Sequence, residues 1–242
     1  MQTEKLQAFV LSAMDYGDSD RIVSLFTLEH GRIRNFARGA RNSRKRFGAA
    51  LEPFTRIEAH IRLKQEGLSG LQQADILNIY PGIRLDLGRI AHALYACELI
   101  DAITPEGLSL PRLFRLQSAY LDRLEAVPAS SADRRFFEIN LLNILGYRPS
   151  LDACSRCNTP FNGSATLLPG GELICRFCSS GGRQFDEITL KMLRSCLATG
   201  TFGLVVFPAP SLEQAGALLD EAAAAHTGRR LKSLDFLRQV AE

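Results

Sequence analysis

Four of the six cysteines are spaced as metal ligands. Cys154 and Cys157 form one Cys-x₂-Cys pair, Cys175 and Cys178 form a second pair, and 17 residues separate the two. This spacing lies within the range of four-thiolate zinc sites. In such sites two tight turns direct the sulfurs onto one cation and complete a tetrahedron. The sequence therefore predicts one structural Zn²⁺ ion bound by these four cysteines.

Two other uses of the cysteines stay open. A redox dithiol would need one Cys-x₂-Cys pair beside a β-α-β unit, a pattern that we do not find. A catalytic zinc would need an open coordination position, and four thiolates fill the sphere. No secretory signal or membrane span is read, so we expect a soluble, cytoplasmic chain with reduced thiols. Cys97 and Cys196 stand alone on predicted helices and are expected in the core.

Basic side chains gather in the first third of the chain. Between residues 32 and 64, ten Lys and Arg stand against Glu52 and Glu58, a local charge of +8 in a chain whose net charge is +3. This polarised distribution favours a polyanionic partner. The cations of the densest part are Arg32, Arg34, Arg38, Arg41, Arg44, Lys45 and Arg46.

The spacing of these cations predicts a surface for single-stranded nucleic acid. Arg32, Arg34 and Arg38 recur at period 2 with Phe36 in the same row, so one strand face would carry cations for phosphates and a ring for a base. We expect this strand to continue into a hairpin, and binding to be independent of sequence. The alternative is a merely solvated basic face, with Phe36 in the core.

Residues for enzymatic chemistry are scattered. We find no nucleotide-binding glycine motif, HExxH or GxSxG. His30, His60, His92 and His226 do not stand at ligand spacing from one another and are expected to be structural or solvated. The acidic residues 15, 18 and 20 could hold a divalent metal, although a solvated turn explains them more simply. We therefore expect a binding protein and no enzyme.

The elements that position these residues fall into two kinds. Strict alternation of apolar and polar residues at 56–64 predicts a half-buried strand, and residues 6–11, 21–28, 31–38 and 68–76 are further strand candidates. About five short strands in 80 residues suit a small barrel such as the OB-fold. From Pro81 the apolar residues recur at helical spacing.

Cap residues mark where the helices should begin and end. A first helix has its apolar stripe from Leu87 to Cys97, and a second follows Pro111. Further helices are expected from Ser130 to Gly146, from Asp186 to Leu197, from a Ser211–Gln214 capping box to His226, and over residues 231–240. The predicted fold class is α+β and multidomain. An N-terminal OB-fold β-barrel at residues 1–80 precedes an α-helical domain at 81–242 that carries the zinc-binding insertion at 152–180.

Several segments together resemble the RecO family of recombination mediators. They are residues 7–11, 27–34, 37–43 and 48–55, the cysteine loop after residues 145–147, and residues 228–233. The likeness touches the whole chain but is dense only in the first 75 residues.

The resemblance implies an OB-fold followed by a helical domain. It implies that the chain anneals complementary single strands, with duplex DNA as a further ligand, and that with RecR it helps RecA displace SSB from gapped DNA. By the same likeness Arg38, Arg41, Arg44, Lys45 and Arg46 contact DNA, and the acidic SSB tail docks on the helical domain. Because some members lack the cysteines, zinc would support structure. Association with the nucleoid follows.

Two other functional classes stay open at this point. One is an OB-fold protein that binds RNA, because charge and stacking do not separate RNA from DNA. The other is a zinc-ribbon interaction protein, in which Arg156 and Arg176 beside the cysteines face a protein or a nucleic acid.

Overall fold

The computed structural model describes residues 3–64 and 67–240 of the chain. The chain divides into two compact units. The first comprises Met1–Pro128 and Leu231–Glu242, and the second comprises Ala129–Arg230. The end of the chain therefore belongs to the same unit as its beginning.

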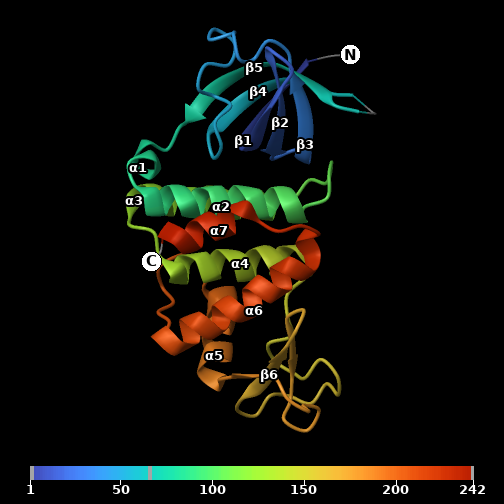
Figure 1. Ribbon diagram of the computed structural model, residues 1–242, viewed down its shortest axis with the longest axis vertical. Helices are drawn as coiled ribbons and strands as arrows, with labels where there is room; N and C mark the ends of the chain where they lie inside the picture. Colours follow the sequence, from blue (N-terminus) through green and yellow to red (C-terminus); the bar gives the residue numbers. More distant parts are fainter. Residues whose placement is uncertain (1–2, 65–66, 241–242) are drawn as a thin grey trace. The chain divides into compact units, whose positions relative to one another are not determined.

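The described strands of the first unit close into a barrel (Figure 1). They are β1 (Thr3–Tyr16), β2 (Asp20–Thr27), β3 (Gly31–Ala37), β4 (Arg56–Arg62) and β5 (Ser69–Asn78). Their order is β1-β2-β3-β5-β4, and β4 pairs with β1. β3 and β5 run parallel, whereas the other neighbours are antiparallel. A closed five-stranded barrel of this order is an OB-fold, so the predicted N-terminal barrel is confirmed.

Alternating burial explains why these segments form a barrel. In β4 the side chains of Ile57, Ala59 and Ile61 are fully buried, while the residues between them are partly exposed. Successive side chains of a strand point to opposite faces, so a period-2 pattern turns one face to the core. The other face of β4 remains partly exposed, whereas residues 23–27 of β2 and 8–11 of β1 are buried on both faces.

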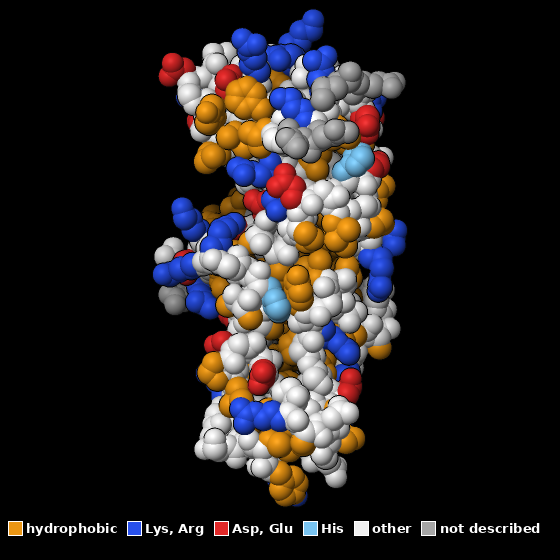
Figure 2. Space-filling view, turned by 90° about the vertical axis from the view of Figure 1, so that its right-hand side faces the viewer, with side chains coloured by type: hydrophobic (Ala, Val, Ile, Leu, Met, Phe, Trp, Pro, Cys, Tyr) orange, Lys and Arg blue, Asp and Glu red, His pale blue; other side chains and the backbone are white. Residues whose placement is uncertain are grey.

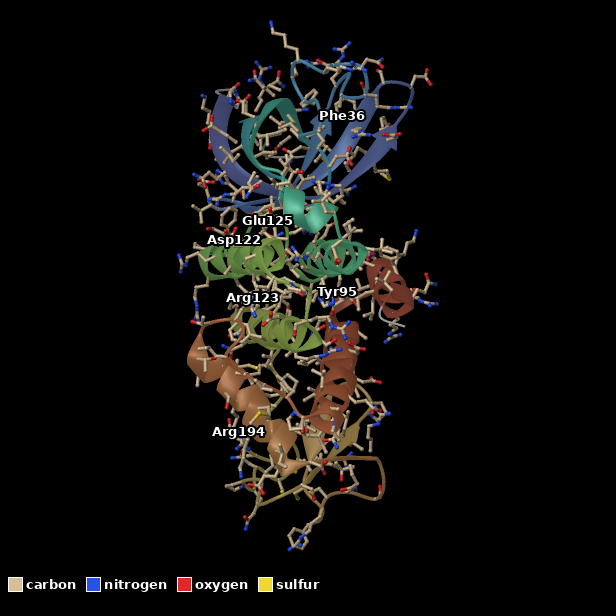
Figure 3. All side chains as sticks on the ribbon, turned by 90° about the vertical axis from the view of Figure 1, so that its left-hand side faces the viewer. Phe36, Tyr95, Asp122, Arg123, Glu125 and Arg194 are labelled. Carbon is tan, nitrogen blue, oxygen red and sulfur yellow. The ribbon has the colours of Figure 1, made fainter. Side chains whose placement is uncertain are left out.

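Helices α1 (Pro81–Arg84), α2 (Leu87–Ile103) and α3 (Pro111–Ala126) follow the barrel. Glu125 of α3 lies close to α1 (Figure 3) and accepts hydrogen bonds from the backbone N–H groups of Gly82 and Ile83, both at 2.9 Å. It thereby satisfies donors at a helix start that have no partner within the helix. The ring of Phe114 in α3 packs on that of Phe9 in β1, with centroids 4.9 Å apart. The helices therefore cover one end of the barrel core.

The last helix, α7 (Lys232–Val240), packs against α2. The Glu98 carboxylate of α2 accepts hydrogen bonds from the backbone N–H of Ser233 at 2.7 Å and from its hydroxyl at 2.5 Å. A negative charge at the start of a helix also interacts favourably with its dipole. None of the helices in the described part of the chain is long and apolar enough to cross a membrane.

Gly31, the first residue of β3, meets the segment after α2 so closely that no side chain fits. Its φ is +63°, and a Cβ would lie 1.7 Å from the carbonyl oxygen of Leu108. We expect Gly31→Ala to lower the free energy of unfolding by about 2–5 kcal/mol, through overpacking and left-handed strain. Urea unfolding measures this loss.

The matched control is Gly17→Ala. Gly17 has a similar φ of +61°, but no atom lies within 4 Å of the position that a Cβ would take there. This substitution should cost only about 1–2 kcal/mol, the strain of the left-handed conformation alone. Equal losses in the two variants would contradict the proposed backbone clash.

The second unit contains helices α4 (Ser131–Leu145), α5 (Glu187–Thr199) and α6 (Ala209–Thr227). Strands β6 (Ala165–Leu168), β7 (Glu172–Ile174) and β8 (Arg183–Phe185) form a small sheet in the order β7-β6-β8. The hydroxyl of Ser130 caps α4 by accepting from the N–H of Ala132 at 3.2 Å, and Gly146 ends it with a φ of +80°. Both predicted ends of this helix are confirmed.

The predicted start of α6 is wrong. The helix begins at Ala209, and Ser211 lies buried inside its first turn. Prolines are tolerated in a first helical turn, so Pro210 lets the helix start upstream of the predicted cap. Gln214 forms no capping box. Its side-chain carbonyl accepts instead from the backbone N–H of Asp186 at 2.8 Å.

Candidate nucleic-acid interface and metal centre

The outer face of β3 carries cations and one aromatic ring. Burial alternates along this strand, so that Arg32, Arg34 and Phe36 face outward, and the exposed Arg38 follows the strand end. Figure 2 shows Lys and Arg side chains gathered on the barrel at the top of the view. Phe36 therefore lies on the outside of the barrel and does not belong to its core.

Phe36 has an aromatic neighbour that sequence reasoning missed. The rings of Phe36 and Tyr16 meet edge to face, with centroids 5.8 Å apart and an angle of 81°. Tyr16 is 55% exposed and Met14 is 56% exposed, while Ile22 lies opposite both Met14 and Phe36 in the strand register. We call Met14, Tyr16, Ile22 and Phe36 the outer aromatic row. Only the pairing of β1, β2 and β3 brings these residues together.

Arg32 is committed to contacts within its own unit. Its Nε donates to the backbone carbonyl of Thr104 at 3.0 Å. Its guanidinium also lies 3.8 Å from the Asp101 carboxylate and 3.9 Å from that of Glu106, and the side chain is only 17% exposed. Arg34, on the same face, is exposed. Among the cations of β3, Arg34 is thus the one presented to solvent.

The basic segment that follows β3 forms no hairpin, and that prediction is wrong. β3 and β4 are not neighbours in the barrel, because β5 lies between them. Residues 38–54 instead form successive turns that bury Phe47 and Leu51 in the barrel core. Arg46 fastens these turns, since it donates to the carbonyl of Arg38 at 2.8 Å and stacks over Phe47 at 5.0 Å. The side chains of Arg38, Arg44 and Lys45 remain exposed.

Acidic residues at the adjoining ends of β1 and β2 orient this basic segment. Asp15 pairs with Arg21 at 3.0 Å and with Arg41 at 3.6 Å. The Asp20 carboxylate accepts from the backbone N–H of Gly39 at 2.6 Å. Their carboxylates therefore serve cations and backbone donors of the protein, which explains them without a divalent metal.

A cleft of about 620 Å³ opens beside β3. Arg34, Lys64 and His30 supply polar and basic groups to its lining, and Leu63 and Leu68 supply apolar ones. Glu106 and Gly107 also line it. The cleft thus continues the basic face of β3 into a concave region of the same unit.

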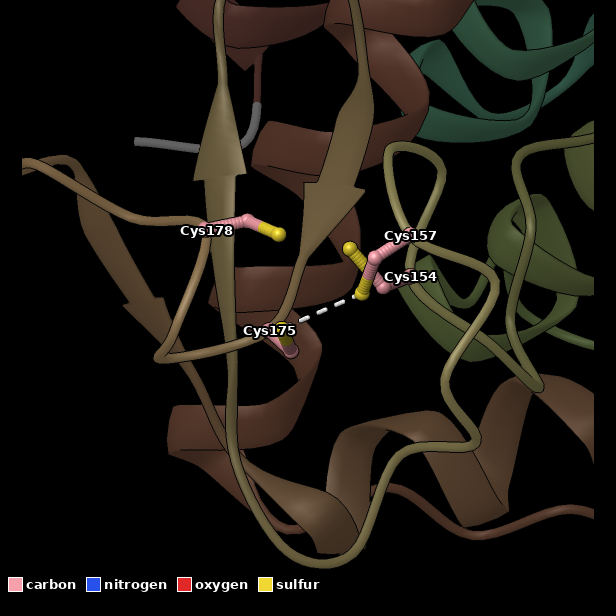
Figure 4. A group of neighbouring side chains, drawn as sticks. All are labelled: Cys154, Cys157, Cys175 and Cys178. Carbon is pink, nitrogen blue, oxygen red and sulfur yellow. Dashed lines mark hydrogen bonds between the residues drawn. The ribbon is translucent and has the colours of Figure 1, made fainter.

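The four predicted cysteines converge in the second unit (Figure 4). Their sulfurs all lie within 4.8 Å of one another, and the Cys157 and Cys175 sulfurs are 3.7 Å apart. A tetrahedral zinc with bonds of about 2.3 Å would place its sulfurs about 3.8 Å apart. Cys154 and Cys175 are buried, and Cys157 is exposed. The group could therefore hold one metal ion.

Hydrogen bonds around the cysteines shift the pKa of three of the four thiols in different directions. Burial raises the pKa of Cys154, but hydrogen bonds from the backbone of Cys157, Cys175 and Arg156 outweigh it and bring the pKa to about 6. Bonding with the Thr159 side chain and backbone lowers the pKa of Cys157. Bonds to the Cys157 and Cys175 sulfurs raise the pKa of Cys178 to about 12. Binding of a metal ion requires the thiolate form of a cysteine and would therefore release the protons that these thiols carry.

The cysteine loop is fastened to helices of the same unit at two points. Arg194 of α5 donates to the carbonyl of Leu151 at 2.8 Å. At the β6–β7 turn, the N–H of Gly170 donates to the Glu221 carboxylate of α6 at 3.1 Å. The adjacent Gly171 approaches Ala222 so closely that a Cβ would lie 3.0 Å from it. Closure of the cysteine site and packing of the loop on α5 and α6 therefore depend on each other.

A second ligand-like group lies on the barrel and was missed. His60 lies 2.9 Å from the Asp75 carboxylate and 3.5 Å from that of Glu58. Asp75 belongs to the neighbouring strand, so no spacing along the chain reveals the group. Lys5 already pairs with Glu58 at 3.3 Å. The geometry is that of a histidine held between carboxylates on the outer face of β4 and β5.

The remaining predicted residues lie where expected. Cys97 and Cys196 are buried in the core. His92 is buried and bonds the Tyr120 hydroxyl at 2.9 Å, and His226 stacks on Tyr147 with ring centroids 4.0 Å apart. His30 lies 3.2 Å from Glu4. These histidines have structural partners or are partly solvated.

Comparison with known proteins finds the same family along nearly the whole chain. A family model described as Recombination protein O N terminal matches residues 1–80, and one described as Recombination protein O C terminal matches residues 84–235. The chain is 69% identical over 241 residues to the DNA repair protein RecO of Pelobacter propionicus, covering 99% of this chain and 98% of that protein. Identity to the protein of the same name from Geobacter sulfurreducens is 51% over 242 residues, covering 99% of each chain.

Proposed function

Since the chain belongs to the RecO family and hence acts in DNA repair and recombination, we propose that it is a single-strand-binding mediator. It binds single-stranded DNA on the OB-fold barrel and anneals complementary strands. With RecR it assists the loading of RecA onto DNA coated by SSB. It works by binding alone, without covalent chemistry.

One observation carries this proposal. The outer aromatic row, with Tyr16 more than half exposed, lies on the same barrel face as the exposed Arg34. Aromatic rings that stack bases, together with cations that follow the phosphates, are what proteins use to bind unpaired strands without reading their sequence. Stacking on an aromatic ring tolerates any of the four bases, because every base has a π-face.

The exposed cations have different roles from those already engaged. Arg34, Arg38, Arg44 and Lys45 are the proposed phosphate contacts, and the cleft beside Arg34 extends the path. Arg41 is a further proposed phosphate contact. Its guanidinium pairs with Asp15, and a phosphate would compete with that carboxylate for it. Arg32 and Arg46 position the surface, because each donates to a backbone carbonyl of the protein.

The metal site supports the second unit. We propose one structural Zn²⁺ ion on Cys154, Cys157, Cys175 and Cys178, because four soft thiolates suit zinc and leave no open position for a substrate. The partners RecR, RecA and the acidic SSB tail are inferred from the family, as are duplex DNA as a second ligand and a cytoplasmic location on the nucleoid.

Competition binding and strand annealing test the function. Labelled single-stranded DNA should be displaced better by unlabelled single strands than by duplex DNA, and the protein should accelerate annealing of bare and of SSB-coated complementary strands. Stronger competition by single-stranded RNA, without annealing of DNA, would support an RNA-binding protein instead. No oligonucleotide binding at low salt would reject the proposal altogether.

Replacement of Tyr16 tests the stacking role. Loss of one stacked base costs about 1–3 kcal/mol, so Tyr16→Ala should weaken single-strand affinity about 5- to 150-fold while duplex affinity changes less. Fluorescence anisotropy at fixed salt measures both. Tyr16→Phe should keep the affinity, because it keeps the ring. Ile188→Ala is the control for an equally exposed apolar side chain, since Ile188 is 54% exposed in the second unit.

A further inference from the structure

An aromatic ring is exposed at the second cysteine pair. Phe177, between Cys175 and Cys178, is 80% exposed. The guanidinium carbon of Arg176 lies 4.7 Å from the centre of its ring. A cation over an aromatic face is held by the ring's electron density, so the Arg176 side chain lies against one face of Phe177.

A second guanidinium reaches the same place from the first cysteine pair. Nη1 of Arg156 donates to the backbone carbonyl of Cys178 at 3.3 Å. Within residues 3–64 and 67–240, neither Arg156 nor Arg176 pairs with a carboxylate. We call Arg156, Arg176 and Phe177 the knuckle tip. It combines two positive charges with one exposed ring.

Support of the metal site does not account for this tip. A divalent metal on four thiolates carries a net charge of −2, and neighbouring guanidiniums offset that charge. This explains the two arginines but gives no role to Phe177. The ring is not needed for the turn, whose bonds are made by backbone groups such as the N–H of Cys178 to the Cys175 carbonyl at 3.1 Å.

We propose that the knuckle tip is a second binding surface for an unpaired nucleic-acid strand. A base stacks on Phe177, and the phosphates on either side lie against Arg156 and Arg176. This inference rests on the proposed barrel function, because it gives one chain two strand-binding surfaces in separate units. A chain that holds two strands raises their effective concentration for each other, which is what annealing requires.

The exposure of Phe177 favours a base over an acidic peptide. A peptide held by arginines and by an apolar anchor needs a walled pocket for that anchor. Phe177 is four-fifths exposed, so it offers a face for stacking and no wall. The Arg176 guanidinium carbon, 4.7 Å from the ring centre, places a positive charge next to that face.

Bridging of two strands tests the proposal in the full-length protein. One donor-labelled and one acceptor-labelled oligonucleotide, not complementary and each too short to reach both surfaces, are titrated onto the protein. Energy transfer reports simultaneous binding, and anisotropy of one strand reports the barrel. Phe177→Ala should weaken binding of the second strand about tenfold and leave the first unchanged. Phe177→Tyr should restore bridging, and Val206→Ala, which alters a side chain that is also 80% exposed, should have no effect.

The possible outcomes separate the two proposals. Wild-type protein that binds no single strand removes the barrel function. If the wild-type protein binds a single strand but Phe177→Ala bridges two strands as well as the wild type does, only the proposal for the knuckle tip is overturned. Binding of a fluorescent oligo-aspartate peptide that Phe177→Ala abolishes, with bridging unchanged, would assign the tip to an acidic protein partner and also overturn the proposal. Should Phe177→Ala lose metal, Arg176→Glu provides the same test.

Discussion

Charge reversal of Arg44 and Lys45 is expected to weaken single-strand affinity on the order of 10- to 100-fold at low salt. Both side chains are exposed in the turns that follow β3, so their loss removes phosphate contacts without disturbing the core. Each contact releases counterions from the strand, and the logarithm of the affinity falls with the logarithm of salt by about 0.7 per contact. Arg44→Glu/Lys45→Glu should therefore also flatten this slope by about 1.4.

The salt slope separates a direct contact from a general effect of charge. Arg112→Glu/Arg115→Glu changes the net charge equally at two exposed positions of α3. This control should lower the affinity modestly through the long-range field and leave the slope near that of the wild type. Titrations of a short oligonucleotide at several salt concentrations measure both quantities. A wild-type affinity and slope in the Arg44→Glu/Lys45→Glu variant would exclude this segment from the DNA path.

Cys175→Ser is expected to remove the metal and to destabilise the second unit by several kcal/mol. Four-cysteine zinc sites contribute on the order of 10–16 kcal/mol to the folding of small peptides. The loss should be smaller in this protein than in those peptides, because hydrogen bonds at Gly170 and Leu151 still hold the cysteine loop on α6 and α5 without the metal. Metal analysis should fall from one zinc per chain to none, and the thermal transition of this unit should move to lower temperature.

The barrel provides the internal control for that experiment. The cysteine site belongs to the second unit, so single-strand affinity at the barrel should be largely retained in Cys175→Ser. Cys97→Ser replaces a buried thiol of the first unit and should alter stability without loss of metal. A Cys175→Ser protein with unchanged thermal stability would show that the metal has no structural role. If the metal analysis found another metal in place of zinc, the proposed metal would be wrong, but the four proposed cysteine ligands would stand.

The metal site and the barrel could be predicted because their signals are local. Tight turns bring Cys154 to Cys157 and Cys175 to Cys178 wherever the loop lies, so spacing alone indicates four ligands. The alternation of β4 and the caps of α4 act in the same way, since backbone geometry decides them over a few residues. A local signal was also misleading at Ser211. The predicted cap lies inside the first turn of α6, which begins at Ala209 and contains a proline.

The sequence alone thus determined the strands, most helices, the metal ligands and the basic character of the first unit. Only the tertiary structure decided which cations are presented to solvent. Arg32 and Arg46 are not available to a ligand in the same way, because they donate hydrogen bonds to the backbone carbonyls of residues 104 and 38. It likewise placed Tyr16 beside Phe36 across β2. Ligand turns and strand faces depend on neighbours along the chain. A binding surface depends on which distant segments satisfy or expose each side chain, and strand pairing and packing settle that only when the chain has folded.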